Sequence, residues 1–343
     1  MKVLLLAGGD SSERDVSLDS GAAIHESLTR LGHTVIAIDT ADGKSLLASD
    51  GKFPTGKVKS APVVTQTNNS GALTLAKSIS TPEFCEFDVV FLALHGGKGE
   101  NGSLQNLLEL AKVPFTGSDM KASAIAMDKA TSKRLFESAR IPTPKWKAYT
   151  IYSGEIEESV IKDIKKSFKL PVIVKPNDGG STIGLTIVKK QIEMRAAFEL
   201  SLKESPVVLV EDYIKGRELT VPVIDSQALP VIEIIPKSGL YDYEAKYTKG
   251  MTEYVVPAQI PAKKAKEIQK AALKVYEIIG ASGLARVDFM ITKSGKFYCL
   301  ELNTLPGMTE LSLSPMAAKA SGINFDQLVD KMVQSAIRRF KKR

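Results

Sequence analysis

Short apolar runs alternate with a helical pattern in the first hundred residues, and this alternation limits the fold more than any other feature of the sequence. Four segments read in order as strand, helix, strand and strand: residues 3–6, 18–28, 34–38 and 88–94. Helices between successive strands are typical of a parallel sheet that is covered on its faces. We therefore predict an α/β domain and place it at residues 1–118.

The rest of the chain reads as a mixture of helices and strands. One helix is predicted at 122–139, because Pro142 and Pro144 stop any helical pattern soon afterwards. A glycine-rich loop at 178–184 then lies between two short strands, 172–174 and 185–188, after a helix at 155–166. Further strands surround a helix at 263–279; they are predicted at 207–211, 219–224, 285–291 and 296–301. These patterns predict two α+β domains, at 119–210 and 211–343.

Length and composition exclude several classes of protein. The chain has 343 residues, 43% of them hydrophobic, which suits two or three domains with cores of their own. The amino terminus lacks the pattern of a signal peptide, and no apolar run is long enough to span a membrane. Cys85 and Cys299 lie far apart without a CxxC pair, so neither a disulfide framework nor a zinc site is indicated. We expect a cytoplasmic protein.

The formal net charge of +7 would suit either nucleic acid or an anionic small molecule. No run of lysines interleaved with aromatics is present, so we expect no nucleic-acid partner. Basic residues gather only in the tail, at Arg338, Arg339, Lys341, Lys342 and Arg343. We interpret this tail as the solvated end of a helix.

Two strand segments near the carboxyl end carry the strongest chemical signal. Arg286 and Asp288 are two residues apart, as are Glu301 and Asn303, so each pair shares one face of its strand. If the strands pair, Asp288, Glu301 and Asn303 offer hard oxygen ligands that suit Mg²⁺ bound together with nucleotide phosphates. Arg286 would then supply charge to a transferring phosphoryl group. The alternative is a surface hairpin with salt-bridged outward faces.

Lysines lie in three informative places, Lys129, Lys175 and Lys246. Lys175 ends an apolar strand, where a charge needs a reason to sit, and phosphate oxygens would be such a reason. The loop 179–182 that follows has small residues whose amides can approach a phosphate, although it lacks the GxxxxGK[ST] pattern. Such a loop can also be only a turn.

Two further places follow predicted strands near the amino end. Gly8 and Gly9 precede a helix and could form an anion site at its N-terminus, with Glu13 in the same segment. Glu13 and its charged neighbours could equally form a solvated first turn. His95 lies where the ligand-binding loops of open α/β sheets gather, but a lone histidine can also be structural.

Read together and in order, seven segments resemble the D-alanine:D-alanine ligase family of the ATP-grasp superfamily: GGDSSERDVSLDSG, HGGKGENGSLQ, MDK, VIVKPNDGGSTIG, YEAKY, ARVDF and ELNTLPGMTELSLSPMAAKASG. The resemblance runs from residue 2 to about residue 322 and is weakest at 39–80. It implies an ATP-grasp fold, in which an amino-terminal parallel α/β domain is followed by two α+β domains that enclose ATP.

The resemblance implies a nucleotide and metal site. The residues that would bind ATP are Lys129, Lys175, Glu211, Tyr213, Ile214, Glu218 and Lys246. Of these, the first two would contact phosphates, Glu218 would take the ribose hydroxyls, and Lys246 would belong to a loop that closes over the site. Asp288, Glu301 and Asn303 match the ligands of two Mg²⁺ (or Mn²⁺) ions, and Arg286 matches the arginine that stabilises the transferring phosphate.

The resemblance also implies sites for two D-alanine substrates. Glu13 would hold the ammonium group of the first, while Ser181 and Tyr247 would complete a hydrogen-bonded triad with it. His95 would lie near the first substrate. Gly307 and Ser312 would face the second.

The implied reaction forms D-alanyl-D-alanine for peptidoglycan synthesis, with ADP and phosphate as the other products. The first carboxylate attacks the γ-phosphate of ATP, and the second amine attacks the resulting acylphosphate. Tyrosine at position 247 indicates the dipeptide rather than D-alanyl-D-lactate, and the family implies a homodimer. Two alternatives are a related ligase with a different second substrate and a nucleotide-binding module without catalysis.

Overall fold

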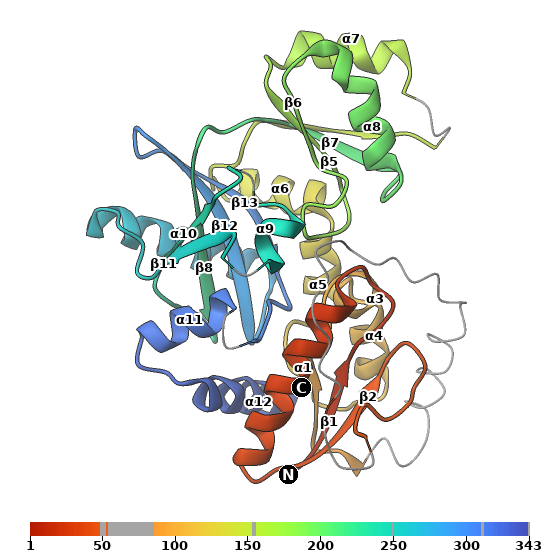
Figure 1. Cartoon of the computed structure of the whole chain (residues 1–343), viewed down its shortest axis with the longest axis vertical. Helices are drawn as coiled ribbons and strands as arrows, with labels where there is room; N and C mark the ends of the chain where they lie inside the picture. Colours follow the sequence, from red (N-terminus) through yellow and green to blue (C-terminus); the bar gives the residue numbers. More distant parts are fainter. Residues whose placement is uncertain are drawn as a thin grey trace.

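Three β-sheets organise the part of the chain that the structure describes, each built from its own stretch of sequence (Figure 1). The computed structural model describes residues 1–48, 53, 86–152, 156–239, 241–248, 250–309 and 312–341; the side chain of Tyr247 lies outside the described part. The predicted loops or hairpin at 39–80 and Cys85 fall largely or wholly outside these residues. No helix in the described ranges combines the length and apolar character needed to cross a bilayer.

The first sheet is parallel, as its alternating pattern predicted. β1 (Lys2–Ala7) lies between β2 (Thr34–Asp39) and β3 (Val89–Leu92). Successive side chains of β1 enter different cores: Val3 and Leu5 pack with helices α1 (Arg14–Arg30) and α12 (Phe325–Lys341), and Leu4 and Leu6 pack with α4 (Ser103–Leu110). The sheet is therefore buried on both faces, and one face is covered by the last helix of the chain.

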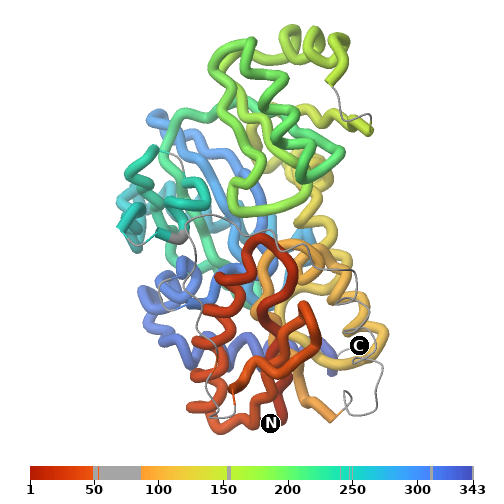
Figure 2. Tube along the Cα trace, turned by 45° about the vertical axis from the view of Figure 1, so that its right-hand side comes forward, coloured from red at the N-terminus to blue at the C-terminus, as the bar shows by residue number. Residues whose placement is uncertain are grey.

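The second sheet is antiparallel and small. Its strand order is β4 (Trp146–Thr150), β7 (Val207–Asp212), β5 (Val172–Pro176) and β6 (Thr186–Val188). Helices α7 (Glu158–Ser167) and α8 (Met194–Leu202), the latter preceded by the 3₁₀ turn η2 (Gln191–Glu193), share a core with it. Figure 2 shows this unit, in yellow-green and green, at the far end of the molecule from the first sheet.

The third sheet joins six strands and holds the predicted hairpin. Its order is β11 (Thr252–Val255), β10 (Ile232–Pro236), β8 (Gly216–Ile224), β12 (Leu284–Thr292) and β13 (Phe297–Asn303), with β9 (Gln227–Ala228) paired to β8. Helices α5 (Met120–Met127), α6 (Lys129–Ser138) and α10 (Ala262–Ile279) share its core. Short helices α3 (Gly97–Glu100), α9 (Tyr243–Tyr247) and α11 (Leu313–Ala320) border the space between the sheets.

The helix predicted at 122–139 is two helices. The Asp128 side chain accepts a hydrogen bond from Thr131 N at 2.8 Å, so Asp128 caps α6 and ends α5. An N-cap aspartate satisfies an amide that the helix leaves free, and it adopts an extended backbone while doing so. The break makes Lys129 the first residue of α6, which turns it towards the glycine-rich loop.

The predicted domain boundary at 210/211 falls inside β7. This boundary and the one at 118/119 remain predictions.

The interpretation of the basic tail as a solvated helix end was wrong for Arg339. Lys341 is exposed, and Lys342 and Arg343 lie outside the described residues. Arg339 donates to the carbonyl oxygens of Phe115 and Gly117 and to the Ser282 hydroxyl, and its guanidinium lies 4.7 Å from the centre of the Phe115 ring. Arg338 pairs with Asp225 at 2.6 Å. Arg339 thus joins the last helix to both the first and the third sheet.

Replacing Arg339 by methionine is expected to lower the free energy of unfolding by about 1–3 kcal/mol, because buried carbonyl oxygens lose their donor. Urea unfolding measures the change. Arg338→Met is the matched control: its guanidinium is 60% exposed, and its loss should cost about 0–1 kcal/mol. Equal effects of the two changes would contradict the role given to Arg339.

Candidate active site

Two adjoining cavities lie where the three sheets meet. The larger, about 560 Å³, is lined by predicted substrate residues: Glu13, His95, Ser181, Arg286, Gly307 and Ser312. The second, about 380 Å³, is lined by every residue predicted to bind ATP: Lys129, Lys175, Glu211, Tyr213, Ile214, Glu218 and Lys246. Several residues line both, including Lys129, Ser181, Arg286 and Glu301. The cavities therefore open onto one another, and the predicted metal ligands lie at their junction.

The hairpin of β12 and β13 places the predicted metal ligands on one face. Arg286 lies opposite Asn303, and Asp288 lies opposite Glu301. Directly opposed residues of antiparallel strands point to the same side of the sheet. Asp288 accepts from Asn303 Nδ2 at 3.0 Å and from Arg286 at 2.9 Å, and Thr220 Oγ1 donates to it at 2.5 Å. The predicted convergence of these side chains is confirmed by the strand register.

The donor set suits a hard divalent cation completed by phosphate oxygens. Two carboxylates and one amide are oxygen donors of the kind that Mg²⁺ prefers, and they lie beside cationic groups that would also attract phosphate. Nowhere in the described ranges do three or more His, Cys, Asp or Glu side chains cluster to hold a metal on their own. Asp288, Glu301 and Asn303 would therefore need oxygens from the bound nucleotide to complete a coordination shell.

Glu301 and Glu218 both line the 380 Å³ cavity, and their pKa values differ strongly. Burial alone would raise the pKa of Glu301, but Lys129, Lys175, Lys246 and Arg286 together lower it to about 2. Lys129 Nζ is 3.6 Å from Glu301. Burial raises the pKa of Glu218 to about 7, and the nearby Asp288 adds to the rise. Glu301 therefore keeps its charge, whereas Glu218 holds a proton much more readily.

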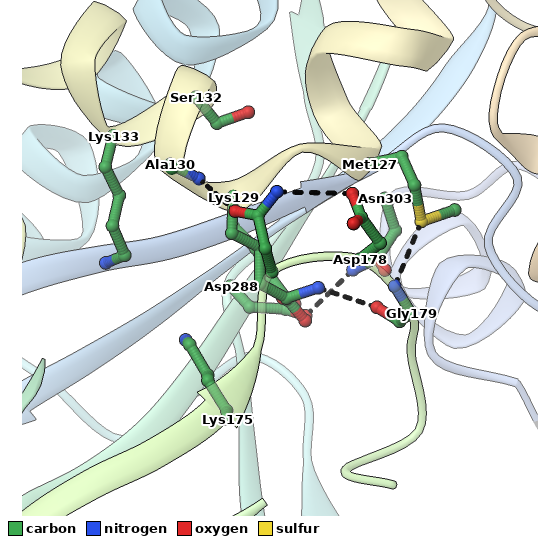
Figure 3. A network of polar contacts seen from close by, with 12 residues as sticks. Met127, Lys129, Ala130, Ser132, Lys133, Lys175, Asp178, Gly179, Asp288 and Asn303 are labelled. Atoms are coloured by element: carbon green, nitrogen blue, oxygen red, sulfur yellow. Dashed lines mark hydrogen bonds and ion pairs between the residues drawn. The ribbon is translucent and has the colours of Figure 1, made fainter. Parts of the chain in front are cut away.

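The glycine-rich loop is held from both sides. Lys129 Nζ donates to Gly179 O at 2.6 Å, and Ala130 N donates to Asn177 Oδ1 at 2.8 Å (Figure 3). Ser181 and Thr182 have φ values of 51° and 65°, a left-handed conformation that is costly for residues other than glycine. Thr182 Oγ1 donates to Tyr241 O at 2.9 Å, which joins the loop to the segment before α9. These bonds fix the loop over the junction.

The first-substrate residues are partly brought together. Ser181 Oγ donates to Glu13 Oε1, so a residue of the second sheet's loop contacts the start of α1. Glu13 also lies beside Gly96, at the end of the first sheet. Tyr247 belongs to α9, but its side chain lies outside the described part of the chain, so its place in the predicted triad stays a prediction.

His95, Ser20 and Glu100 hold the loop after β13, and the sequence analysis missed the last two. His95 shares a hydrogen bond with Leu305 O at 2.9 Å and another with Ser20 Oγ at 3.0 Å, so both ring nitrogens already have protein partners. Glu100 Oε1 accepts from the amides of Thr304 and Leu305, each at 3.2 Å. This loop follows Asn303 and carries Gly307. His95 therefore supports the site through the loop, and a direct contact with substrate stays a prediction.

The anion site predicted at Gly8 and Gly9 was wrong. Gly8 N donates to Ser17 Oγ at 2.8 Å, and Gly9 N donates to Asp39 Oδ1 at 3.0 Å. Arg14 pairs with Asp39, which fixes the same turn. Because both glycine amides already bind side chains of the protein, they are not available to an anion.

The remaining predicted residues lie at the cavity walls. Lys246 lies 5.2 Å from the centre of the Tyr241 ring, and Tyr241 lines both cavities, although the sequence analysis did not single it out. Ser312 Oγ accepts from Thr309 N at 3.0 Å and lies close to Gly307. Tyr241 lies just before the motif YEAKY, in a run whose sequence has no pattern that could have marked it as a site residue.

A parallel sheet followed by two antiparallel sheets, with lysines and a carboxylate hairpin around the cavity between the latter two, defines the class of ATP-grasp ligases. The predicted fold class is confirmed by solved structures. The chain matches a D-alanine–D-alanine ligase from Bacillus anthracis complexed with ATP, with a TM-score of 0.77, 30% identity and coverage of 100% of this chain and 98% of that one. The ligase from Coxiella burnetii matches with a TM-score of 0.79, 25% identity and coverage of 100% and 95%.

Sequence comparison is more specific. Residues 2–118 match the family model for the D-ala D-ala ligase N-terminus, and residues 135–334 match that for the C-terminus. The D-alanine–D-alanine ligase of Syntrophotalea carbinolica is 42% identical over 98% of this chain and 96% of that protein, and that of Aquifex aeolicus is 39% identical over 97% and 100%. The chain belongs to the D-alanine–D-alanine ligase family.

Glu218 gives a test of the charge in the nucleotide cavity. Between its ordinary pKa of 4.5 and its folded pKa of about 7, the unfolded chain loses the proton while the folded protein keeps it. Stability that Glu218 contributes at low pH is therefore lost as pH rises through this window. Glu218→Gln should remove roughly 1–3 kcal/mol of that pH-dependent fall. Urea unfolding at several pH values, with EDTA and no nucleotide, measures it; an unchanged slope would refute the assignment.

Proposed function

We propose that the two cavities divide one ligase reaction between them, with ATP in the 380 Å³ cavity and two D-alanine molecules in the 560 Å³ cavity. Membership of the family over nearly the whole chain makes the protein a D-alanine–D-alanine ligase. The single observation that supports the division is the hairpin at the junction, where Arg286 and Glu301 line both cavities.

The nucleotide would be held by charge at its phosphates and by apolar contact at its base. Lys129 and Lys175 are buried cations in the cavity wall, and desolvated lysines attract phosphate more strongly than exposed ones. Ile173, Ile187 and Leu300 line the same cavity and offer apolar contacts to the base. Bound Mg²⁺ or Mn²⁺ would neutralise phosphate charge at Asp288, Glu301 and Asn303.

The amino-acid substrates would be positioned by groups already fixed in the protein. Glu13, hydrogen-bonded to Ser181, would accept the ammonium group of the first D-alanine, whose carboxylate would then lie towards Arg286. Gly307 and Ser312 would contact the second D-alanine. Attack on the γ-phosphate would give D-alanyl phosphate, and attack by the second amine would expel phosphate. Catalysis would then rest on orientation, charge and exclusion of water.

The finer parts of this proposal are the residue roles, the metal ions and the identity of the second substrate. A homodimer and a cytoplasmic location also stay predictions.

Mass spectrometry of the products tests the proposal. Incubation with ATP, Mg²⁺ and D-alanine should give D-alanyl-D-alanine, ADP and phosphate in equal amounts. Parallel incubations replace the second substrate by D-lactate, L-alanine or other D-amino acids. A dominant mixed product would indicate the related ligase, and ATP binding without D-alanine-dependent phosphate release would indicate a module without catalysis.

Glu301→Gln should lower kcat by about 100-fold or more, because it removes an anionic ligand of the metal ion that would neutralise the reacting phosphate. Phosphate release at saturating D-alanine, measured across a range of Mg²⁺ concentrations, should show a higher Mg²⁺ requirement. Glu199→Gln, on the exposed face of α8, is the control and should behave as wild type. Near-normal turnover of Glu301→Gln would exclude the metal role.

A further inference from the structure

One buried charge near the site has no part in the mechanism above. Lys133, on α6, is 0% exposed. Among the described residues that line the two cavities, Lys133 does not appear, although Lys129 does, one helical turn earlier. Lys133 therefore cannot touch a bound substrate directly, and any effect on the reaction must pass through its neighbours.

Lys133 shares a single carboxylate with Lys175. Lys133 Nζ lies 3.3 Å from Glu211 Oε1, and Lys175 Nζ lies 2.9 Å from the same oxygen. Figure 3 shows the two lysines pointing towards each other, one from α6 and the other from β5. Lys133 Nζ also donates to Thr143 Oγ1 at 2.8 Å, and Thr143 Oγ1 donates to Cys299 O at 2.9 Å. Lys133 is thus held behind Glu211.

The fold alone gives little reason to keep a charge at this position. Burying an ammonium group costs several kcal/mol, and a buried ion pair is weak evidence for stability, because apolar side chains of similar volume can often replace the whole pair without loss. Burial lowers the pKa of Lys133, although Glu211 acts against it. Glu211 would still have Lys175 as a partner if Lys133 were absent. The cost of burying Lys133 therefore points to a use beyond stability.

Lys175 is claimed by more than one anion. Lys175 pairs with Glu211, and the negative charge of Glu301 also acts to raise the pKa of Lys175. In the proposed function it binds the phosphates of ATP as well. When a phosphate group binds Lys175, another cation must balance the charge of Glu211. Lys133 is placed to do so from outside the cavity.

Glu211 lines the cavity in which the proposed function places the base of ATP. It is 2% exposed and lines the 380 Å³ cavity with apolar side chains, among them Ile173, Ile187 and Leu300. An ionised carboxylate only accepts hydrogen bonds. It can accept one from the exocyclic amino group of adenine, whereas the carbonyl oxygen at the same position of guanine is an acceptor and would be repelled.

We propose that Lys133 is a positioning residue for base selection: it holds Glu211 charged and oriented, so that the nucleotide cavity takes adenine in preference to guanine. This inference rests on the proposed place of the base in that cavity. It assigns Lys133 a function in discriminating between ATP and GTP, with no contact to either nucleotide.

Lys133→Met tests the inference, because methionine keeps the length of the side chain and removes the charge. KM for ATP should rise about tenfold, and the ATP-to-GTP preference in kcat/KM should fall about tenfold, the worth of one charged hydrogen bond. The kcat at saturating ATP should stay within about twofold, since no reacting atom is touched.

Three further single variants and one double variant sharpen the test. Lys147→Met is the matched control: its ammonium pairs with Asp163 at the surface, and it should leave every value unchanged. Lys133→Gln keeps a hydrogen-bond donor without charge, so it should lose preference as methionine does. Glu211→Gln should lose the same preference, and adding Lys133→Met to it should change nothing further. Lys133→Gln and Glu211→Gln also test the inference if Lys133→Met does not fold.

Several outcomes would overturn the inference. These are an unchanged ATP-to-GTP preference in Lys133→Met, a full recovery of preference in Lys133→Gln, or additive losses in the double variant. The proposed function fails separately: if wild-type protein makes no dipeptide but calorimetry shows that Lys133→Met shifts ATP binding against GTP, the role of Lys133 stands alone. If wild-type protein binds the two nucleotides equally, the inference is wrong whatever the product.

Discussion

The pairing register of β12 and β13 is the constraint on which the rest of the site depends. Val287, Phe289 and Leu302 face the core that the sheet shares with α10, and their burial fixes which residues lie opposite one another. A slip by one residue would turn this apolar set outward and the charged set inward. Hydrophobic packing on one face of the hairpin therefore sets the positions of Arg286, Asp288 and Glu301 on the other, and the lysines from neighbouring elements gather around them.

Features that depend on local pattern could be read from the sequence. The period of two in ARVDF and ELN placed four polar side chains on common faces before any pairing was known, and the register then brought the faces together. Apolar runs buried on both sides gave the first sheet in the same way. Short strands such as β10 and β11 escaped because they have only five and four residues, too few for an alternating pattern to stand out.

Features that depend on tertiary partners could not be read. Lys133 and Arg339 are ordinary basic residues of amphipathic helices until the carboxylate or carbonyl oxygens that they meet are known. The same holds for Glu100, whose partners lie about two hundred residues away. The prediction of an anion site at Gly8 and Gly9 was wrong for a related reason. Side chains from α1 and β2 accept hydrogen bonds from the amides that the local sequence pattern suggested were available. The identity of the amino-acid substrates rested on family resemblance throughout.

The place of α12 has a consequence for how the protein is made. Val3 and Leu5, near the start of the chain, share their core with Leu328, Val329 and Met332, near its end. On the ribosome, the first sheet is synthesised long before the helix that covers this face. Until residues 325–341 have been synthesised, that apolar face lacks its cover of α12 and is open to chaperones or to other nascent chains. The core on this face of the first sheet is therefore completed only after both later sheets have been synthesised.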